Sequence, residues 1–507
     1  MPKKSSIFYG TIMLTAVNLV LRLSSMGFQV YLSGQIGAAG IGLLQLTLSV
    51  AGFAMTIGMA GIRTATMYLT AEAVGSGRRN GVSHVLSACL VYSFLFSAVS
   101  AILLFQFAPQ IAAHWIGDPR TESAIRVYAA FLPVVCLGGV MAGYFTAAGR
   151  IRDLVRVEVL EQLVSMGTTV LLLTRWANGS AGKSCASVIL GSGVGSLLTL
   201  ICLMGLRKGE TSTLPKHREA GLVPRLLKVA LPLALADNLR MGISTLENLI
   251  VPRRLALFPG SEPLAAFGQI AGMVFPTMMF PAAVLYSLAE LLIPELARCS
   301  AAGKNSRIRD LTAKSLRLAL LYGLAAGGIL FTSAQNLGLL LYDSLKVGTL
   351  LRWFSILVPM LYVDAIVDAN VKGMGQQVAS VRYNTLTSFL DVVFLWVLLP
   401  RYGLAGYYLS FLVTHVLNFL LSLSRLIKVT KLRPSFSIVL RSVLSWILGL
   451  SISSFLPHPQ GLGGILFLST GFLLLFGLLL TLLGVLGKED LQWIKRLVID
   501  KNGAARI

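Results

Sequence analysis

The sequence predicts an all-α polytopic membrane protein of about 14 transmembrane helices, built as two pseudo-symmetric six-helix lobes plus two C-terminal helices. Of its 507 residues, 55% are hydrophobic and only 13% are charged, which lies outside the range of soluble domains. About 14 apolar stretches of roughly 18 to 25 residues lie between charged or Gly/Pro-rich breaks, and each is long enough to cross a hydrocarbon core. Several landmarks of the first half also recur 226 residues later.

The apolar stretches define the expected helices in chain order. We place them at 6–30, 37–65, 81–107, 123–146, 154–176, 184–206, 224–250, 262–288, 311–334, 350–372, 377–399, 404–424, 438–456 and 463–486. The longest charged connection inside this region follows the sixth stretch, so it is expected to link the two lobes.

The recurring landmarks indicate a duplicated unit. They pair Arg126 with Arg352, Pro133 with Pro359, Gly149 with Gly375, Arg156 with Arg382 and Arg175 with Arg401. Chance is the alternative, but a chance register in an apolar chain would mostly pair leucines, whereas these residues mark kinks and helix ends. The duplication predicts an N-lobe at 1–212, a C-lobe at 213–436, two further helices within 437–486 and a cytoplasmic tail at 487–507.

The basic residues predict the orientation. Only nine of the 43 Lys and Arg residues fall in one set of alternate loops. These nine are Arg120, Arg126, Arg175, Lys183, Arg253, Arg254, Lys346, Arg352 and Arg401. The positive-inside pattern therefore places both termini in the cytoplasm. The net charge of +22 then reports topology and attraction to membrane lipids, and we expect no nucleic-acid partner.

Polar side chains follow one face of several apolar helices. Asn18, Arg22, Ser25 and Gln29 recur at helical spacing in the first helix, Arg63 ends a similar stripe in the second, and Arg240 and Glu247 lie in the seventh. An ionised side chain near the bilayer centre costs about 2.5–3.5 kcal/mol, so these residues are expected to line a wet cavity that holds an anionic headgroup. Arginine suits a phosphate or pyrophosphate. The alternative is that the arginines reach an interface or pair with acids to fix helix packing.

Acidic groups gather in the second half and are expected to couple transport to a cation. Asp364 and Asp368 lie one turn apart, Asn384 and Asp391 follow in the next helix, and Asp237 lies in the seventh. Oxygen ligands suit Na⁺ and a titratable acid suits H⁺. The alternative for Asp368 is a simple ion pair with Lys372, four residues on.

Catalytic and metal-binding motifs are absent from the sequence. The five cysteines show no metal-like spacing and imply no disulfide framework. We therefore expect no enzymatic activity, no cofactor, and no metal beyond a coupling Na⁺. Transport would have to run on an ion gradient, the membrane potential or the gradient of the cargo.

The opening helices resemble a known family. The residues that carry the resemblance are Arg22-Leu23, Gly27-Phe28, Gly37, Gly40-Ile41-Gly42-Leu43-Leu44-Gln45 and Gly61-Ile62. They are similar to the multidrug, oligosaccharidyl-lipid and polysaccharide exporter superfamily, and within it to the polysaccharide flippases of the stage V sporulation protein B type. Relatives usually have a proline where this chain has Arg63.

The resemblance implies a monomeric flippase of the bacterial cytoplasmic membrane. Its cargo would be an undecaprenyl-linked sugar, either a peptidoglycan precursor or a polysaccharide unit, moved by alternating access, with a link to sporulation. Related flippases use N-lobe arginines against pyrophosphate, which matches Arg22 and Arg63. Some hold Na⁺ among helices 7, 11 and 12, where Asp237, Asn384, Asp391 and Thr414 offer suitable groups.

Two alternatives to this function stay open. The first is an ion-coupled multidrug exporter of the same fold. The second is a membrane glycosyltransferase or polymerase, which would need a large outer loop with acidic or metal-binding groups.

Overall fold

A computed structural model describes residues 4–75, 79–177, 179–208, 222–432 and 435–486. Within these ranges the chain forms helices and no strand, which confirms the predicted all-α class. The predicted cytoplasmic tail at 487–507 lies outside the described residues.

The helices have the following bounds. In chain order they are α1 (Lys4–Met59), α2 (Ile62–Gly75), α3 (Arg79–Gln106), α4 (Ala108–Gln110), η1 (Ile111–Ile116), η2 (Pro119–Thr121), α5 (Glu122–Ala147), α6 (Ile151–Leu172), η3 (Leu173–Ala177), α7 (Ala181–Lys208), α8 (Leu222–Leu255), α9 (Pro263–Gln269), η4 (Ile270–Val274), α10 (Phe275–Met279), α11 (Ala283–Ala301), α12 (Asn305–Tyr342), α13 (Leu345–Ser355), α14 (Val358–Gly373), α15 (Gln377–Thr430), α16 (Phe436–Ser453) and α17 (Gly461–Leu482).

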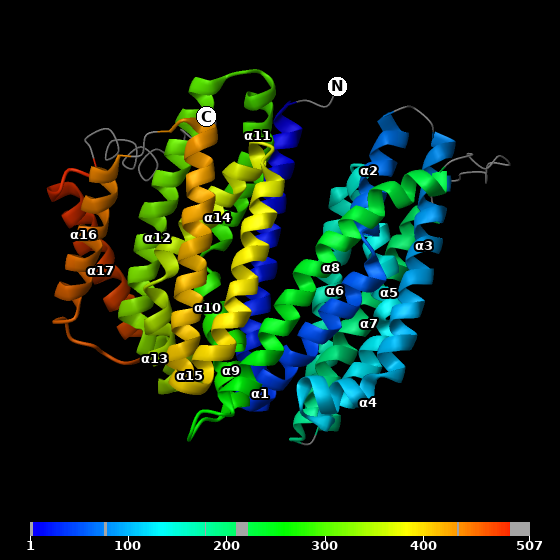
Figure 1. Cartoon of the computed structure of the whole chain (residues 1–507), viewed down its shortest axis with the longest axis horizontal. Coiled ribbons are helices and arrows are strands. Elements are labelled where there is room, and N and C mark those ends of the chain that lie inside the picture. The colour runs from blue at the N-terminus through cyan, green and yellow to red at the C-terminus, as the bar shows by residue number, and fades with distance from the viewer. Residues whose placement is uncertain (1–3, 76–78, 178, 209–221, 433–434, 487–507) are drawn as a thin grey trace. The chain divides into compact units, whose positions relative to one another are not determined.

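Two helices are far longer than a membrane is thick. At 1.5 Å per residue, the 56 residues of α1 and the 54 of α15 would each extend about 80 Å if straight. Both are broken by a glycine in a non-helical conformation, Gly37 (φ 69°, ψ 173°) and Gly403 (φ 55°, ψ −134°). Glycine is suited to these positions because it lacks the Cβ atom that disfavours positive φ. Figure 1 shows α15 folding back on itself at this break.

The described residues contain nine helical stretches that are long and apolar enough to cross a membrane, or up to 11 if each of two bent helix pairs is one span. These two pairs are α9–α10 with α11, bent by 64°, and α13 with α14, bent by 54°. The chain is therefore a multi-pass membrane protein, while the number of fourteen spans stays a prediction.

Helix starts recur at the spacing that the sequence landmarks indicated. α3 begins at Arg79 and α12 at Asn305, whereas α6 begins at Ile151 and α15 at Gln377; both pairs lie 226 residues apart (305 − 79 and 377 − 151). The glycines just before α6 and α15, Gly149 and Gly375, both have a φ of +74°. Matching helix starts and matching turn conformations support duplication rather than chance.

The chain divides into two compact units. The first comprises Met1–Gly272 with Ser388–Ser410, and the second comprises Met273–Thr387 with Phe411–Ile507, so α15 contributes to both. The lobe bounds drawn from the sequence stay a prediction.

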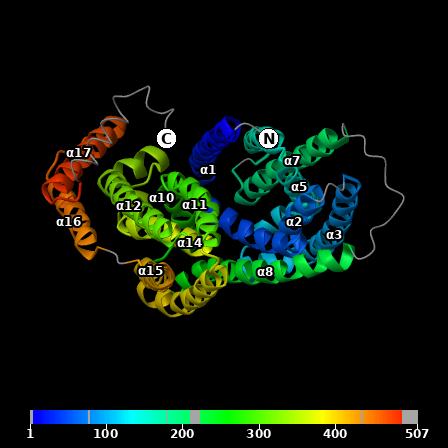
Figure 2. The same cartoon turned by 90° about the horizontal axis from the view of Figure 1, so that it is seen from above.

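The first unit has a core of small and apolar side chains from α2, α3, α5, α7 and α8. Ile62, Leu86, Cys89, Phe145 and Leu203 are fully buried in it. Figure 2 shows α8 running along one side of α2 and α3. Close van der Waals packing of these side chains holds the helices together, because lipid provides no hydrophobic driving force between them. Many outward-facing leucines and phenylalanines stay exposed, as expected next to lipid.

The second unit has a core where α16 and α17 pack on α12. Phe472 is fully buried and stacks on Phe476, and Leu324 and Trp446 complete the contact. Gly328 of α12 lies against the Phe472 ring so closely that a Cβ atom would overlap it. The glycine therefore allows α17 to approach α12, and Figures 1 and 2 show these helices side by side.

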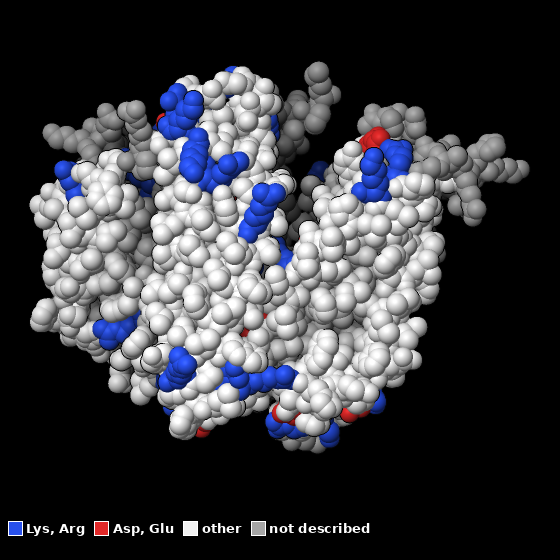
Figure 3. Space-filling model, viewed as in Figure 1, with Lys and Arg blue, Asp and Glu red and all other residues white. Residues whose placement is uncertain are grey.

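Charged side chains are sparse over the middle of the surface seen in Figure 3. On the face shown in Figure 3, most Lys, Arg, Asp and Glu side chains of each unit lie toward the helix ends, and the broad zone between is mostly uncharged. This pattern is typical of a protein whose central band faces hydrocarbon.

Candidate functional site

The polar face of α1 meets α6 within the first unit. Ser25 donates to the Leu21 carbonyl oxygen (2.9 Å). Gln162 of α6 donates from Nε2 both to the Leu21 carbonyl oxygen (3.0 Å) and to Ser25 Oγ (2.9 Å). Arg22 lies beside this contact with an exposed side chain. The side chain of Asn18, predicted on the same stripe, lies outside the described side chains.

Gln29, the last residue of the predicted stripe, has a packing contact. Its Nε2 donates to the Gly272 carbonyl oxygen (2.9 Å), where a turn of η4 passes close to α1. A side chain at Gly272 would collide with Ile41, so this approach depends on the glycine. The structure thus shows a structural role for Gln29 in holding the end of α9–η4 against α1.

Arg63 is the second residue of α2, which begins directly after a backbone turn. Ala60 (φ 43°) and Gly61 (φ 71°) both adopt left-handed conformations. Gly61 also packs against the backbone of α8, where a Cβ atom would be 2.9 Å from the Ala234 nitrogen. The turn presents the Arg63 side chain to solvent, near enough to Glu158 of α6 for an electrostatic interaction.

Two acidic residues of α6 were missed by the sequence analysis. Besides Glu158, Glu161 lies in the span and accepts hydrogen bonds from Ser196 Oγ (2.9 Å) and Thr199 Oγ1 (2.8 Å) of α7. The interpretation that intramembrane acids gather in the second half is therefore incomplete. The signal was present, because Glu158, Glu161 and Gln162 are spaced to share one helix face.

Along α8 the predicted residues separate into two groups. Asp237 and Arg240 are exposed. Glu247, two turns further on, is half-buried and lies within hydrogen-bonding reach of Ser388, with Asp391 as a neighbouring charge. The sequence grouped Glu247 with the headgroup-binding arginines, whereas the structure brings it together with an ion-coupling candidate.

Asp391 is held by the second half of the folded α15. Ser410 Oγ donates to Asp391 Oδ1 (2.5 Å) across the bend at Gly403. Tyr407 lies close enough to interact electrostatically with both Asp391 and Glu247. Two carboxylates, two serine hydroxyls and a phenol thus meet inside the first unit.

The carboxylates, hydroxyls and phenol of this cluster all offer oxygen atoms as ligands, which suits a proton or a hard monovalent cation. Within the described residues, no group of three or more His, Cys, Asp and Glu side chains is placed to hold a metal ion.

The second unit contains another acidic pair. Asp368 forms an ion pair with Lys372 Nζ (2.6 Å) and accepts a hydrogen bond from Ser380 Oγ. The ion pair is the one that the spacing of four residues predicted as the alternative to ion coupling. Asp364, one turn earlier, accepts from Asn418 Nδ2 (3.2 Å).

The remaining two ion-coupling candidates also belong to the second unit. Asn384 is exposed, and its Nδ2 lies 3.5 Å from Ser380 Oγ. Thr414 is buried, with its hydroxyl 3.4 Å from the Phe411 carbonyl oxygen.

Long broken helices carry polar groups inside apolar spans, and comparison with solved structures shows the same fold in known membrane transporters. The inward closed conformation of the lipid II flippase MurJ matches with a TM-score of 0.70 at 13% identity, over 93% of this chain and 98% of that one. The inward-facing conformation of a multidrug resistance MATE family transporter of the MOP superfamily matches with a TM-score of 0.64 at 13% identity, over 82% and 99%. The fold is that of MOP-superfamily flippases and exporters.

The sequence comparisons are more specific. Residues 7–246 match the family described as polysaccharide biosynthesis protein. Stage V sporulation protein B of Bacillus subtilis is 24% identical over 438 residues, which cover 84% of each chain. Sporulation protein YkvU of the same organism is 20% identical over 320 residues, or 62% of this chain and 70% of that one. The resemblance drawn from the opening helices is confirmed.

Proposed function

We propose that this protein is a flippase that moves an undecaprenyl-linked sugar across the bacterial cytoplasmic membrane by alternating access. The cargo would be a peptidoglycan precursor or a polysaccharide unit. The observation that carries the proposal is the exposed Arg22 on the polar face of α1, within the part of the chain that matches the polysaccharide biosynthesis family.

The position of Arg22 supports a role with an anionic headgroup. It lies 18 residues after the start of α1 and 15 before the break at Gly37, which is more than 20 Å of helix on either side at about 1.5 Å per residue. An ionised side chain so far from either end of a membrane-spanning helix is costly unless it faces a polar surface, and an anionic headgroup is one ligand that would favour it there. Ser25 and Gln162 add hydrogen-bonding groups on the same surface.

The Arg63–Glu158 contact refines the proposed headgroup site. Since Glu158 already compensates part of the Arg63 charge, Arg63 attracts pyrophosphate less strongly than an isolated arginine would. We therefore assign the main contact with the cargo phosphate to Arg22 and a supporting contact to Arg63.

The cluster of Glu247 and Asp391 supports cation coupling within the same proposal. Two neighbouring carboxylates in a span repel each other unless one of them binds a proton or both share a cation. Binding and release of H⁺ or Na⁺ there would change the charge of α8 relative to α15. Asp237, Asn384, Thr414 and the Asp364–Asp368 pair remain secondary candidates for this role.

Reconstituted flipping tests the cargo assignment. Purified protein in proteoliposomes should move a fluorescent lipid-linked sugar between leaflets, measured by its loss of protection from a membrane-impermeant quencher. Arg22→Gln should slow flipping about tenfold or more, which corresponds to one charge-assisted contact, whereas Arg22→Lys should keep part of the rate. Arg152→Gln, at an exposed arginine of α6, is the matched control.

Two results would contradict the flippase proposal. One is equal flipping by the Arg22→Gln variant and the wild-type protein. The other is elongation of a lipid-linked glycan by the purified protein alone, which would indicate the polymerase alternative.

A second candidate function is an ion-coupled multidrug exporter, favoured by the match to the MATE transporter. Cells or vesicles containing such an exporter would extrude cationic dyes. If dye extrusion is fast and lipid-linked sugar flipping is absent, the exporter is the better assignment.

A further inference from the structure

An arginine stacks on a phenylalanine at corresponding places in the two units. In the first unit, the Arg126 guanidinium of α5 lies 5.5 Å from the centroid of Phe105 of α3. In the second, the Arg352 guanidinium of α13 lies 4.6 Å from the centroid of Phe331 of α12. Both residues of the pair are shifted by the repeat distance of 226, so duplication has kept the stacked arginine.

The two arginines differ in their charge partners. Arg126 forms an ion pair with Glu122 (2.9 Å), one turn earlier. The residue that corresponds to Glu122 in the second half is Gly348, and among the described residues no carboxylate pairs with Arg352. Gly348 packs on α12, where a Cβ atom would be only 2.9 Å from the Gln335 Cα atom. Helix packing therefore prevents a side chain from replacing the lost carboxylate.

A second carboxylate of the first unit also has an uncharged counterpart in the second unit. Asp118 accepts a hydrogen bond from the Arg120 backbone nitrogen (2.9 Å) and pairs with the Arg120 side chain. Its counterpart is Ser344, which accepts a helix-capping hydrogen bond from the Val347 nitrogen (3.3 Å) but carries no charge. The cation at the position of Arg120 is kept as Lys346. Asp343 is nearby in sequence, but it is exposed and does not line the cavity described next.

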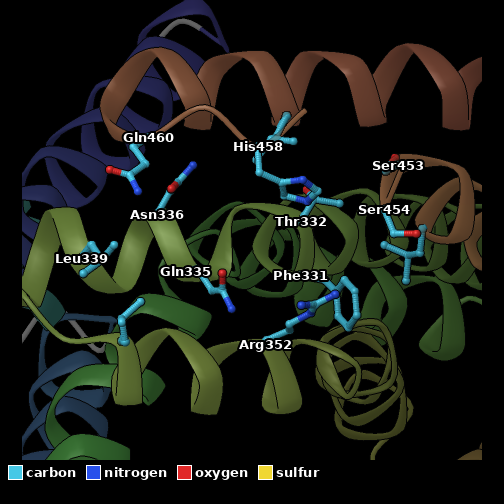
Figure 4. A pocket seen from close by; sticks show the side chains of 13 residues that line it. Phe331, Thr332, Gln335, Asn336, Leu339, Arg352, Ser453, Ser454, His458 and Gln460 are labelled. Carbon is cyan, nitrogen blue, oxygen red and sulfur yellow. The ribbon is translucent and has the colours of Figure 1, made fainter. Parts of the chain in front are cut away.

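Arg352 instead faces a cavity of about 140 Å³ between α12, α13 and the connection from α16 to α17. Figure 4 shows Thr332 and Gln335 of α12, His458 of the connection, and Arg352 around this space. None of the side chains that line it is a carboxylate. Ser453 is 1% exposed, and its hydroxyl has no hydrogen-bond partner among the described residues. The cavity thus offers a cation, the unpartnered hydroxyl of Ser453, and the polar side chains of Gln335 and His458.

Hydrogen bonds between α12 and the α16–α17 segment hold the wall of this cavity in place. Asn336 of α12 donates to the Pro459 carbonyl oxygen (2.9 Å) and holds the α16–α17 connection over the cavity. Ser333 of α12 and Ser469 of α17 share a hydrogen bond (3.2 Å) one turn deeper. The two helices outside the repeat and their connection therefore form one wall of this cavity.

We propose that this cavity binds the phosphate headgroup of an anionic lipid. Guanidinium, amide and hydroxyl donors suit phosphate oxygens, and arginine in particular presents a planar fork that matches a phosphate. Leu339, Leu450 and Leu468 supply apolar wall next to these donors, as the first carbons of a lipid chain require. The cavity lies where α12 and α16 end and α13 and α17 begin, and the ends of membrane-spanning helices are where lipid headgroups are expected.

An ordinary phospholipid and a polyprenyl phosphate present the same chemistry to this cavity. The proposal therefore does not depend on the proposed cargo, because a chain that flips no lipid-linked sugar can still hold a phospholipid here. Free phosphate is the other source of the same group, and the experiment separates it from lipid.

Native mass spectrometry of the purified full-length protein tests the proposal with phosphatidylglycerol, polyprenyl phosphate, phosphatidylcholine and inorganic phosphate as probes. Wild-type protein should retain an anionic lipid about tenfold more strongly than phosphatidylcholine, and millimolar inorganic phosphate should not displace it. Arg352→Gln should remove this preference, and Arg352→Lys should retain part of it because it keeps the charge without the planar fork. Arg126→Gln, the counterpart in the first unit, should leave the preference unchanged.

A photoactivatable anionic lipid gives a second measurement on the unmodified protein. Crosslinks are expected in the peptides that contain Arg352 and His458. Equal retention of phosphatidylglycerol and phosphatidylcholine, an unchanged preference in a folded Arg352→Gln variant, crosslinks confined to other helices, or full displacement by inorganic phosphate would each overturn the proposal.

Discussion

Replacing Asp391 with asparagine should uncouple transport from the cation gradient while leaving the fold intact. The substitution removes the carboxylate charge but keeps an oxygen that can accept the hydrogen bond from Ser410. A charge-assisted hydrogen bond is worth about 1.5–3 kcal/mol and a neutral one about 1 kcal/mol, so the lost hydrogen-bond energy is about 1 kcal/mol. Relief of the repulsion with Glu247 acts in the opposite direction. The net change in stability should therefore be small.

The expected effect on coupling is much larger. If one cation moves with each cargo molecule, a tenfold cation gradient supplies about 1.4 kcal/mol and supports about a tenfold steady-state cargo gradient across the membrane. Without a titratable or charged group at 391, the variant should reach a cargo ratio near one under the same gradient. Glu247→Gln should act in the same direction because it removes the second carboxylate of the cluster.

Proteoliposomes with imposed pH or Na⁺ gradients provide the assay, with labelled cargo counted in each leaflet. Asp310→Asn, at an exposed aspartate of α12 that pairs with Lys314, is the matched control and should keep the full response. If Asp391→Asn protein remains folded and still builds the tenfold cargo gradient, the assignment of coupling to this cluster is refuted.

Three further predictions concern stability, each measured by thermal unfolding of the purified protein. Gly268→Ala should cost about 1–3 kcal/mol, because its Cβ would overlap a backbone carbonyl of α1, whereas Gly27→Ala meets open space and should be neutral or stabilising. Asn370→Ala should cost at least about 2 kcal/mol, since this buried amide bonds three partners in α12 and α14; a shift under one degree would contradict that. Hydrogen bonds from Arg120 lower the pKa of Asp118, so their stabilisation is present above the unfolded pKa of about 3.9 and lost as pH falls through the folded value. Asp118→Asn should remove this acid-dependent loss, which is below about 1 kcal/mol because the pair is partly exposed; an unchanged pH profile would argue against it.

Several features of the fold could be predicted from the sequence because they depend on neighbours along the chain. The length of the apolar stretches predicted a helical membrane protein. Gly149 and Gly375 marked turns before two helices that begin at corresponding positions of the repeat. The ion pair between Asp368 and Lys372 follows from helical spacing alone. These features need no knowledge of which helices meet.

Contacts between distant helices could not be predicted in the same way. Glu247 and Asp391 are 144 residues apart, on α8 and α15, and periodicity shows which face of a helix is polar but not which other face it meets. The hydrogen bond from Ser410 to Asp391 also depends on the bend at Gly403. The apolar sequence around Gly403 does not show in which direction the helix bends. Glu158 and Glu161 are a different case, because their spacing of three residues places both acids on one face of α6 and is visible in the sequence alone.

The glycine at 348 limits how this protein can change during evolution. Whichever half is closer to the ancestor, a single substitution at 348 cannot restore an internal counter-ion for Arg352, because any side chain there would push α13 away from α12. A counter-ion for Arg352 therefore has to come from another position in the chain or from outside it, unless the arginine changes or the two helices move apart. Relatives that carry a side chain at this position should also have lost the arginine or show wider spacing between the two helices.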